Sequence, residues 1–347
     1  MPVLAIYIGT SSISGVIYES SDKYRFISYP YVYSDELFSG YVSEGEYYKS
    51  FITNICAEYK LKLTDVEIVV GTFLKKIDVG FEVKKSFNLP EILNGVSTSR
   101  FPVVVNSYSV VTPNNFISYL VLNDETSVQP DAALSEDEKN FYHNTSVYNS
   151  VVHFDMTTLV DHDRNILAKL ATNELIYNNN LPLTFMGSRF AAPYGFYNTE
   201  IDYILILNLI KKAGIFEVEL DRERYLILQY ILKAYDKSAQ LMAEGKVEKL
   251  GTLINTYGEA ECLITSEIGT SQLLDIEKDK VFVLPLNYNE RAHLTIKSQK
   301  VGAMEKDVTG GKLGLIFDTR VEKVDITSDL KVFNASLKSL GQALSKI

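Results

Sequence analysis

The sequence predicts a two-lobed α/β fold with a β-rich C-terminal region, and three observations support this prediction. The chain has 347 residues, enough for two domains of ordinary size. Its first 72 residues read as three strands, a helix and a fourth strand, and a second run of short strands begins at Val151. We therefore expect a first lobe at 1–150, with an inserted subdomain at about 75–150, a second lobe at 151–267, and a β-rich region with a terminal helix at 268–347.

The first lobe is predicted from the order of its apolar patterns. Continuous apolar residues predict a buried strand over Val3–Ile8, and further strands follow over Ile13–Glu19 and Tyr24–Tyr29 after polar turns. Apolar residues at helical spacing predict an amphipathic helix over Glu44–Lys60. A β-branched run predicts the next strand over Val66–Val70, which completes the order β-β-β-α-β.

The rest of the chain is predicted to alternate between strands and a few helices. Helices are expected at about 200–213, 222–244 and 329–344. Later strands are expected over Phe101–Val111, Phe116–Leu122, Leu250–Asn255, Cys262–Ser266, Val281–Leu286, His293–Ser298 and Leu313–Asp318.

The composition excludes several classes of protein. With 44 acidic and 34 basic residues the net charge is −10, which argues against a protein that mainly binds a nucleic-acid backbone. Two cysteines, Cys56 and Cys262, are too few for a disulfide-stapled scaffold or a four-cysteine zinc site, and we expect both to be packing residues. No apolar stretch is long enough to span a membrane and no signal peptide is visible, so we expect a cytoplasmic protein.

Three short motifs resemble a known superfamily. Residues 6–16 read Ile-Tyr-Ile-Gly-Thr-Ser-Ser-Ile-Ser-Gly-Val. This stretch resembles the first phosphate loop, Asp-Ile-Gly-Thr-Ser-Ser-Ile-Lys, of actin-like ATPases in the branch of the division protein FtsA and the pilus-assembly protein PilM. Residues 154–158 resemble the second phosphate loop, and residues 310–320 resemble the end of the MutL-type proteins associated with glutamate mutase. The resemblance implies an actin-like fold built from ribonuclease H-like lobes.

The same resemblance implies a site for ATP and Mg²⁺. Such loops hold phosphates with backbone N–H groups and small hydroxyls. The carried-over cofactor-binding residues are Gly9, Thr10, Ser11, Ser12, Asp155, Thr157, Thr158 and Gly187, with Asp155 beside the metal. Two plainer alternatives stay open: residues 9–12 as an ordinary hairpin turn, and Asp155 as a polar strand end that caps its own backbone.

One departure from the family pattern bears on activity. Tyr7 stands where the family has an aspartate that holds the metal, and a phenol cannot replace a carboxylate as a ligand of Mg²⁺. We therefore expect a degraded nucleotide site and not an efficient ATPase, and we assign no catalytic residue.

The implied function is that of an assembly or adaptor protein of the pilus-assembly or division type. Its partner would be a protein, such as the cytoplasmic tail of a membrane protein, with self-association left open. An aromatic-rich stretch from Tyr29 to Tyr48 contains no Lys or Arg, which suits a protein partner better than nucleic acid, although such rings also serve as core or loop anchors. The alternatives are an active Mg-ATP-dependent ATPase or reactivating chaperone of the MutL-like kind, and a small-molecule kinase on the same fold.

Overall fold

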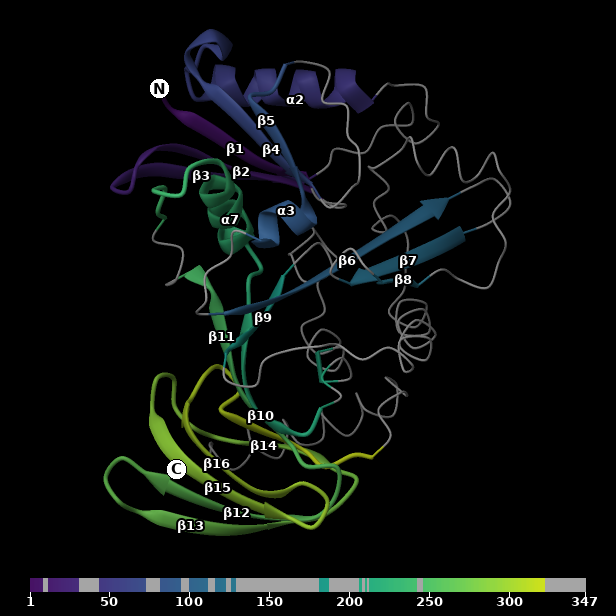
Figure 1. Cartoon of the computed structure of the whole chain (residues 1–347), viewed down its shortest axis with the longest axis vertical. Coiled ribbons are helices and arrows are strands. Elements are labelled where there is room, and N and C mark those ends of the chain that lie inside the picture. Colours follow the sequence, from purple (N-terminus) through teal and green to yellow (C-terminus); the bar gives the residue numbers. More distant parts are fainter. Residues whose placement is uncertain are drawn as a thin grey trace.

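A computed structural model gives the fold of the chain as an α/β arrangement rich in sheets (Figure 1). The residues that it describes are 1–8, 12–30, 44–72, 82–94, 100–111, 116–122, 126–128, 181–186, 206–207, 210, 212–241 and 246–321. The helix expected at 329–344 lies outside the described residues, as does most of the one expected at 200–213.

The first sheet has five strands in the order β3-β2-β1-β4-β5. Its strands are β1 (Val3–Ile8), β2 (Ser12–Ser20), β3 (Lys23–Pro30), β4 (Glu67–Thr72) and β5 (Lys85–Asn88). β1 pairs antiparallel with β2 and parallel with β4, and helix α2 (Glu44–Glu58) joins β3 to β4. The β-β-β-α-β order predicted for the first 72 residues is confirmed.

Both faces of the first sheet are covered, which explains the continuous apolar run of β1. Alternate side chains of a strand point to opposite faces. Leu4, Ile6 and Ile8 pack on one face against α2, and Ala5 and Tyr7 pack on the other face in a core shared with α3 (Leu89–Asn94) and α7 (Tyr225–Tyr235). The first sheet is therefore the middle layer between helices (Figure 1).

The second sheet has eight strands in the order β14-β17-β11-β10-β9-β6-β7-β8. These strands are β6 (Phe101–Val111), β7 (Phe116–Leu122), β8 (Thr126–Val128), β9 (Leu183–Met186), β10 (Gly214–Leu220), β11 (Glu248–Asn255), β14 (Val281–Leu284) and β17 (Leu315–Asp318). They come from all three predicted regions, so the boundaries expected at residues 150 and 267 do not separate hydrogen-bonded sheets. Helix α7 follows β10 and crosses to the first sheet, which ties the two sheets together.

The third sheet has four strands in the order β13-β12-β15-β16. They are β12 (Ala260–Ser266), β13 (Ser271–Ile276), β15 (Arg291–Ser298) and β16 (Gly302–Thr309). One face contributes Cys262, Leu294 and Ile296 to a core shared with Ile254 and Phe317 of the second sheet. The other face is exposed along most of its length, because exposed or partly exposed residues alternate with buried ones along β15.

The remaining predictions of elements are confirmed in part. The strands expected near 101–111, 116–122, 250–255, 262–266, 281–286, 293–298 and 313–318 are present within a few residues of their expected bounds. The helix expected at 222–244 is shorter, because α7 ends at Tyr235 and the chain continues to Leu241 without helical structure. Ala239 and Leu241 still contribute to the core, so their apolar spacing reflects burial and not helix.

Candidate functional site

The predicted phosphate loop joins β1 to β2 at the end of β1. Gly9, Thr10 and Ser11 lie outside the described residues, and Ser12 is described only as the first backbone position of β2. Ile8 and Thr72 end the parallel strands β1 and β4 as register partners, and the Thr72 hydroxyl donates to the Ile8 carbonyl oxygen at 3.4 Å. Ligands of α/β sheets bind outside the carboxyl ends of parallel strands, so the loop begins at an edge suited to a ligand.

The other predicted site residues are not described. Asp155, Thr157 and Thr158 fall in a long stretch outside the described residues, and Gly187 directly follows the last described residue of β9, Met186. Whether these residues approach the β1–β2 turn stays a prediction.

Tyr7, which the sequence resemblance aligns with the metal-binding aspartate of actin-like ATPases, is fully buried. It lies on β1 opposite Ser14 of β2, on the sheet face that packs against α7. The Arg224 guanidinium donates to the Ser14 hydroxyl at 3.1 Å and lies over the Tyr7 ring, with its central carbon 5.9 Å from the ring centroid. Such a contact is a cation–π interaction at the long end of its range. The Arg224 cation therefore lies together with the Tyr7 phenol, which is two positions before Gly9 of the predicted loop.

Arg224 reaches this position through an unusual backbone conformation. Its φ is 61°, in the left-handed region, and its side chain is almost completely buried at the start of α7. A left-handed conformation costs an ordinary residue about 1–2 kcal/mol. The hydrogen bond to Ser14 and the contact with the Tyr7 ring are two interactions that offset this cost.

Asp221 occupies the N-terminus of α7. Its carboxylate accepts hydrogen bonds from the backbone N–H groups of Tyr225, Leu226 and Ile227, at 2.9, 3.0 and 3.4 Å. Burial raises the pKa of Asp221 to about 7, although these three N–H groups and the nearby Arg224 favour the charged form. The end of α7 that could attract an anion is thus already capped by the chain itself.

The C-terminal glycine motif has a packing explanation in the structure. Gly314 has a φ of 69°, and a Cβ added to Gly251 of β11 would lie 2.3 Å from the Gly314 carbonyl oxygen. The turn at residues 310–314 therefore lies directly on the backbone of β11. Asp318, at the end of β17, is buried and forms a bidentate pair with Arg320 at 2.9 and 2.8 Å. Close backbone contact and this ion pair account for the residue types of the motif without a ligand.

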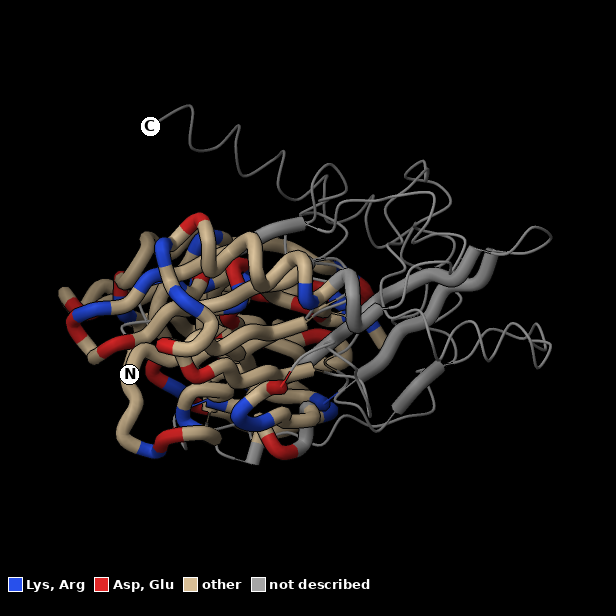
Figure 2. Tube along the Cα trace, turned by 90° about the horizontal axis from the view of Figure 1, so that it is seen from above, with Lys and Arg blue, Asp and Glu red and all other residues tan. Residues whose placement is uncertain are grey.

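Three properties of the described residues bear on the chemistry. Cys56 and Cys262 are buried and burial raises the pKa of both thiols, that of Cys262 to about 12, as expected for packing residues. No group of three or more metal-ligating side chains that could hold an ion is found in the part of the chain that the structure describes. Figure 2 shows basic and acidic residues interleaved along the described elements.

Sequence reasoning missed the residues that the structure brings together around Tyr7. Asp221 carries a signal, since an acidic residue ahead of an apolar run is typical of a helix start. Ser14 and Arg224 are 210 positions apart, and no local pattern links them.

Comparisons with known proteins return only weak likenesses. No protein-family model matches the chain, and no curated protein matches it in sequence. Among solved structures, the ethanolamine utilization protein EutJ from Carboxydothermus hydrogenoformans covers 67% of this chain and 89% of its own, at 9% identity and a TM-score of 0.34. An exopolyphosphatase from Cytophaga hutchinsonii covers 62% of this chain and 76% of its own, at 10% identity and a TM-score of 0.26. These TM-scores are too low for either likeness to support an argument about fold or function.

No helix among the described residues is both long enough and apolar enough to cross a membrane.

Proposed function

We propose that the chain is an actin-like assembly or adaptor protein whose nucleotide site is degraded. Two features support the actin-like part: the motif at residues 6–16, and its position between β1 and β2 of a mixed sheet with the order β3-β2-β1-β4-β5. The protein would act by presenting a surface to a partner, such as the cytoplasmic tail of a membrane protein.

The observation that best supports a degraded nucleotide site is the contact between Tyr7 and Arg224. Mg²⁺ binds hard anionic oxygen, and at the position of the expected carboxylate this chain has a buried phenol. The guanidinium of Arg224, within 5.9 Å of that ring, adds a fixed positive charge that repels a divalent cation. Arg224 is itself buried beneath β1 and β2 and bonded to Ser14, so we do not assign it to a phosphate.

Phosphate release from Mg-ATP tests this proposal. We expect the purified chain to release no phosphate above the rate of a buffer control. Release that is lost in the Asp155→Asn variant would overturn the proposal in favour of an ATPase in which Asp155 alone serves the metal. Phosphate transfer to a small molecule, without release to water, would favour the kinase alternative.

A gain-of-binding variant tests the same proposal from the other side. Tyr7→Asp alone would place the new carboxylate beside Arg224, where the two would pair, so Arg224→Met is combined with it. If residues 9–12 are a decayed phosphate loop, the double variant gains Mg²⁺-dependent affinity for ATP relative to Arg224→Met alone. No gain in a folded double variant, verified by its melting temperature, would favour the ordinary hairpin turn.

A further inference from the structure

The edge strand β13 differs from the other sheet edges among the described residues. Exposed edges invite pairing with other chains, and proteins protect them with short strands, charges or proline. β5, β8 and β14 have only four, three and four residues. β3 carries two basic residues and ends on Pro30, and β16 carries Glu305, Lys306 and Asp307. β13 reads Ser-Gln-Leu-Leu-Asp-Ile, six residues with no Lys, Arg or Pro. It is the least protected of these edges.

Apolar side chains gather on the same hairpin. Leu273 of β13 is 64% exposed, and its register partner Leu263 of β12 is 37% exposed. Ile268, in the turn between the two strands, is 86% exposed. Three of the seven exposed large apolar residues in the described part of the chain therefore lie on one hairpin. The Leu263–Leu273 cross-strand pair and the turn residue Ile268 thus put exposed apolar surface on this hairpin, as interaction sites do.

The backbone of β13 is oriented to accept another strand. The Ser266 N–H donates to the Thr270 carbonyl oxygen at 2.9 Å, which sets the hydrogen-bonded pairs of the β12–β13 ladder. Such pairs alternate with pairs whose backbone groups point outwards. By this alternation the N–H and C=O groups of Ser271, Leu273 and Asp275 point away from β12.

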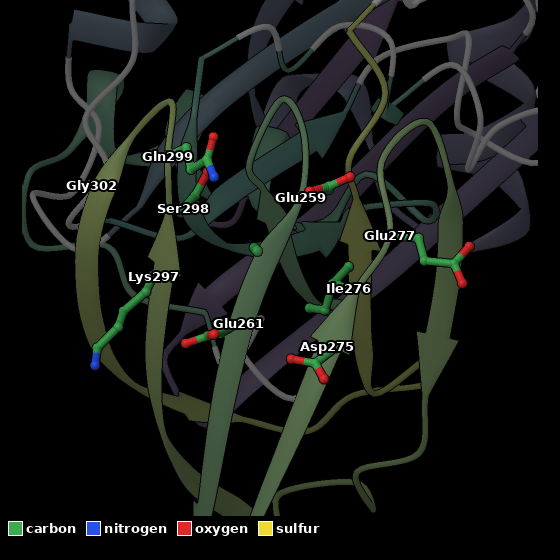
Figure 3. A pocket seen from close by; sticks show the side chains of 10 residues that line it. Glu259, Glu261, Asp275, Ile276, Glu277, Lys297, Ser298, Gln299 and Gly302 are labelled. Atoms are coloured by element: carbon green, nitrogen blue, oxygen red, sulfur yellow. The ribbon is translucent and has the colours of Figure 1, made fainter.

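A hollow of about 550 Å³ lies at the end of β13, where the strands of the third sheet end (Figure 3). Its charged lining consists of four carboxylates and one ammonium group, those of Glu259, Glu261, Asp275, Glu277 and Lys297. Lys280 pairs with Glu277. Glu261 is the direct cross-strand partner of Asp275 on one side and of Lys297 on the other, so this row carries two carboxylates and one ammonium group. A cationic group bound beside Asp275, on the open edge of the row, would balance the second carboxylate.

We propose that the β13 edge binds an extended segment of a partner protein by strand addition, and that this segment carries Lys or Arg at alternate positions next to an apolar residue. Side chains of an added strand alternate between faces, so an apolar residue beside Leu273 puts basic residues beside Asp275 and Glu277. A second copy of this chain is a poorer occupant, because it brings the same carboxylates and a net charge of −10. The inference rests on the proposed adaptor function in one respect: both assume that the ligand is a protein.

A short labelled peptide provides the test. The probe is fluorescein-Val-Leu-Thr-Lys-Val-Lys-Ser-amide, titrated with the full chain by fluorescence anisotropy. We expect binding that weakens as salt is raised, and at least about tenfold weaker binding of the same peptide with both lysines replaced by glutamate. A peptide methylated on alternate backbone nitrogens, which cannot pair as a strand, should lose binding to a similar extent.

Variants of the chain assign the binding to β13. Leu273→Pro removes a backbone N–H that points away from β12 and leaves the hydrogen bonds between β12 and β13 in place, so this variant should no longer bind the peptide. Leu273→Ala keeps the N–H and loses only the side chain, so it should weaken binding of the peptide in part. The double variant Asp275→Lys/Glu277→Lys should bind the lysine peptide at least about tenfold more weakly, because it replaces the attracting carboxylates with like charges. This variant provides the test if Leu273→Pro does not fold. Asp22→Lys/Glu82→Lys makes the same change of net charge on exposed residues of the first lobe and should bind like the wild type.

Three results would overturn the inference: no binding of the lysine peptide, equal binding by wild type and folded Leu273→Pro, or concentration-dependent dimers that Leu273→Pro abolishes. Phosphate release from Mg-ATP is measured on the same samples. Phosphate release together with peptide binding at β13 would overturn the proposed function and leave the inference standing. No phosphate release and no peptide binding would overturn the inference and leave the proposed function standing.

Discussion

The first and third sheets both contain antiparallel hairpins, but they differ in how many of their faces are covered. The first sheet has helices on both faces, and its central strand β1 is apolar at every position. The third sheet is covered on one face, and β15 alternates exposed and buried residues along its length. A sheet buried on both faces has room for a site only at its strand ends, whereas a sheet with an open face and an open edge can bind along its whole length. The proposed functions of the two regions follow this difference.

The largest expected effect is on the covered sheet. Tyr7→Ala removes a fully buried ring from the core under α7, and we expect a loss of about 3–5 kcal/mol in the free energy of unfolding. Denaturant titration measures it, with Tyr7→Phe, which keeps the ring, as the matched control. A loss below about 1 kcal/mol would mean that Tyr7 is not the packed centre of this core.

A close backbone contact connects the second sheet to the glycine motif. Gly251→Ala would bring a Cβ to 2.3 Å from the Gly314 carbonyl oxygen, so we expect a loss of about 1–3 kcal/mol. Gly269→Ala is the control, because Gly269 also has a positive φ but has no atom within 4 Å of an added Cβ. Thermal unfolding of the two variants separates the clash from the backbone strain, and equal losses would contradict the packing explanation of the motif.

Asp221, at the start of the helix α7 that covers the first sheet, makes the stability of the protein depend on pH. Its pKa rises from 3.8 to about 7 on folding, so the folded state holds the proton more tightly than the unfolded state. The contribution of this group to stability is complete below pH 4 and is lost as the pH rises through 7. We expect the stability of the wild type, relative to Asp221→Asn, to fall over that range in denaturant titrations at several pH values. A constant difference would show that Asp221 is charged throughout.

The smallest effect is expected on the open sheet. Leu273→Ala removes a side chain that is 64% exposed, so the free energy of unfolding should change by no more than about 0.5 kcal/mol. The same variant should still weaken binding of the lysine peptide. A loss of stability comparable to that of Tyr7→Ala would show that the hairpin face is covered by the chain itself.

The buried elements of the first sheet could be predicted from the sequence, whereas the exposed edge strands of the third sheet could not. The continuous run of β1 and the helical spacing of α2 identify elements because burial selects residue types directly. β13 and β16 were not predicted, since exposed edge strands with polar residues carry little pattern and form by pairing with β12 and β15. β10 was also missed, although Gly214–Leu220 is almost wholly buried.

The candidate site is predictable only up to its local motif. Residues 9–12 suggest a phosphate loop and Tyr7 suggests its loss, and both follow from reading a few adjacent residues. Arg224 contacts that position only because β10 leads into α7 and α7 crosses to the first sheet. No local pattern in the sequence specifies such a crossing.

The central claim is that the position ahead of the predicted phosphate loop does not support Mg²⁺, and isothermal titration of the wild-type chain with ATP tests it most directly. The titration is run with Mg²⁺ and again with a chelator in its place. The account predicts the same heats in both, whether ATP binds weakly or not at all. Micromolar binding of ATP that requires Mg²⁺ would contradict it.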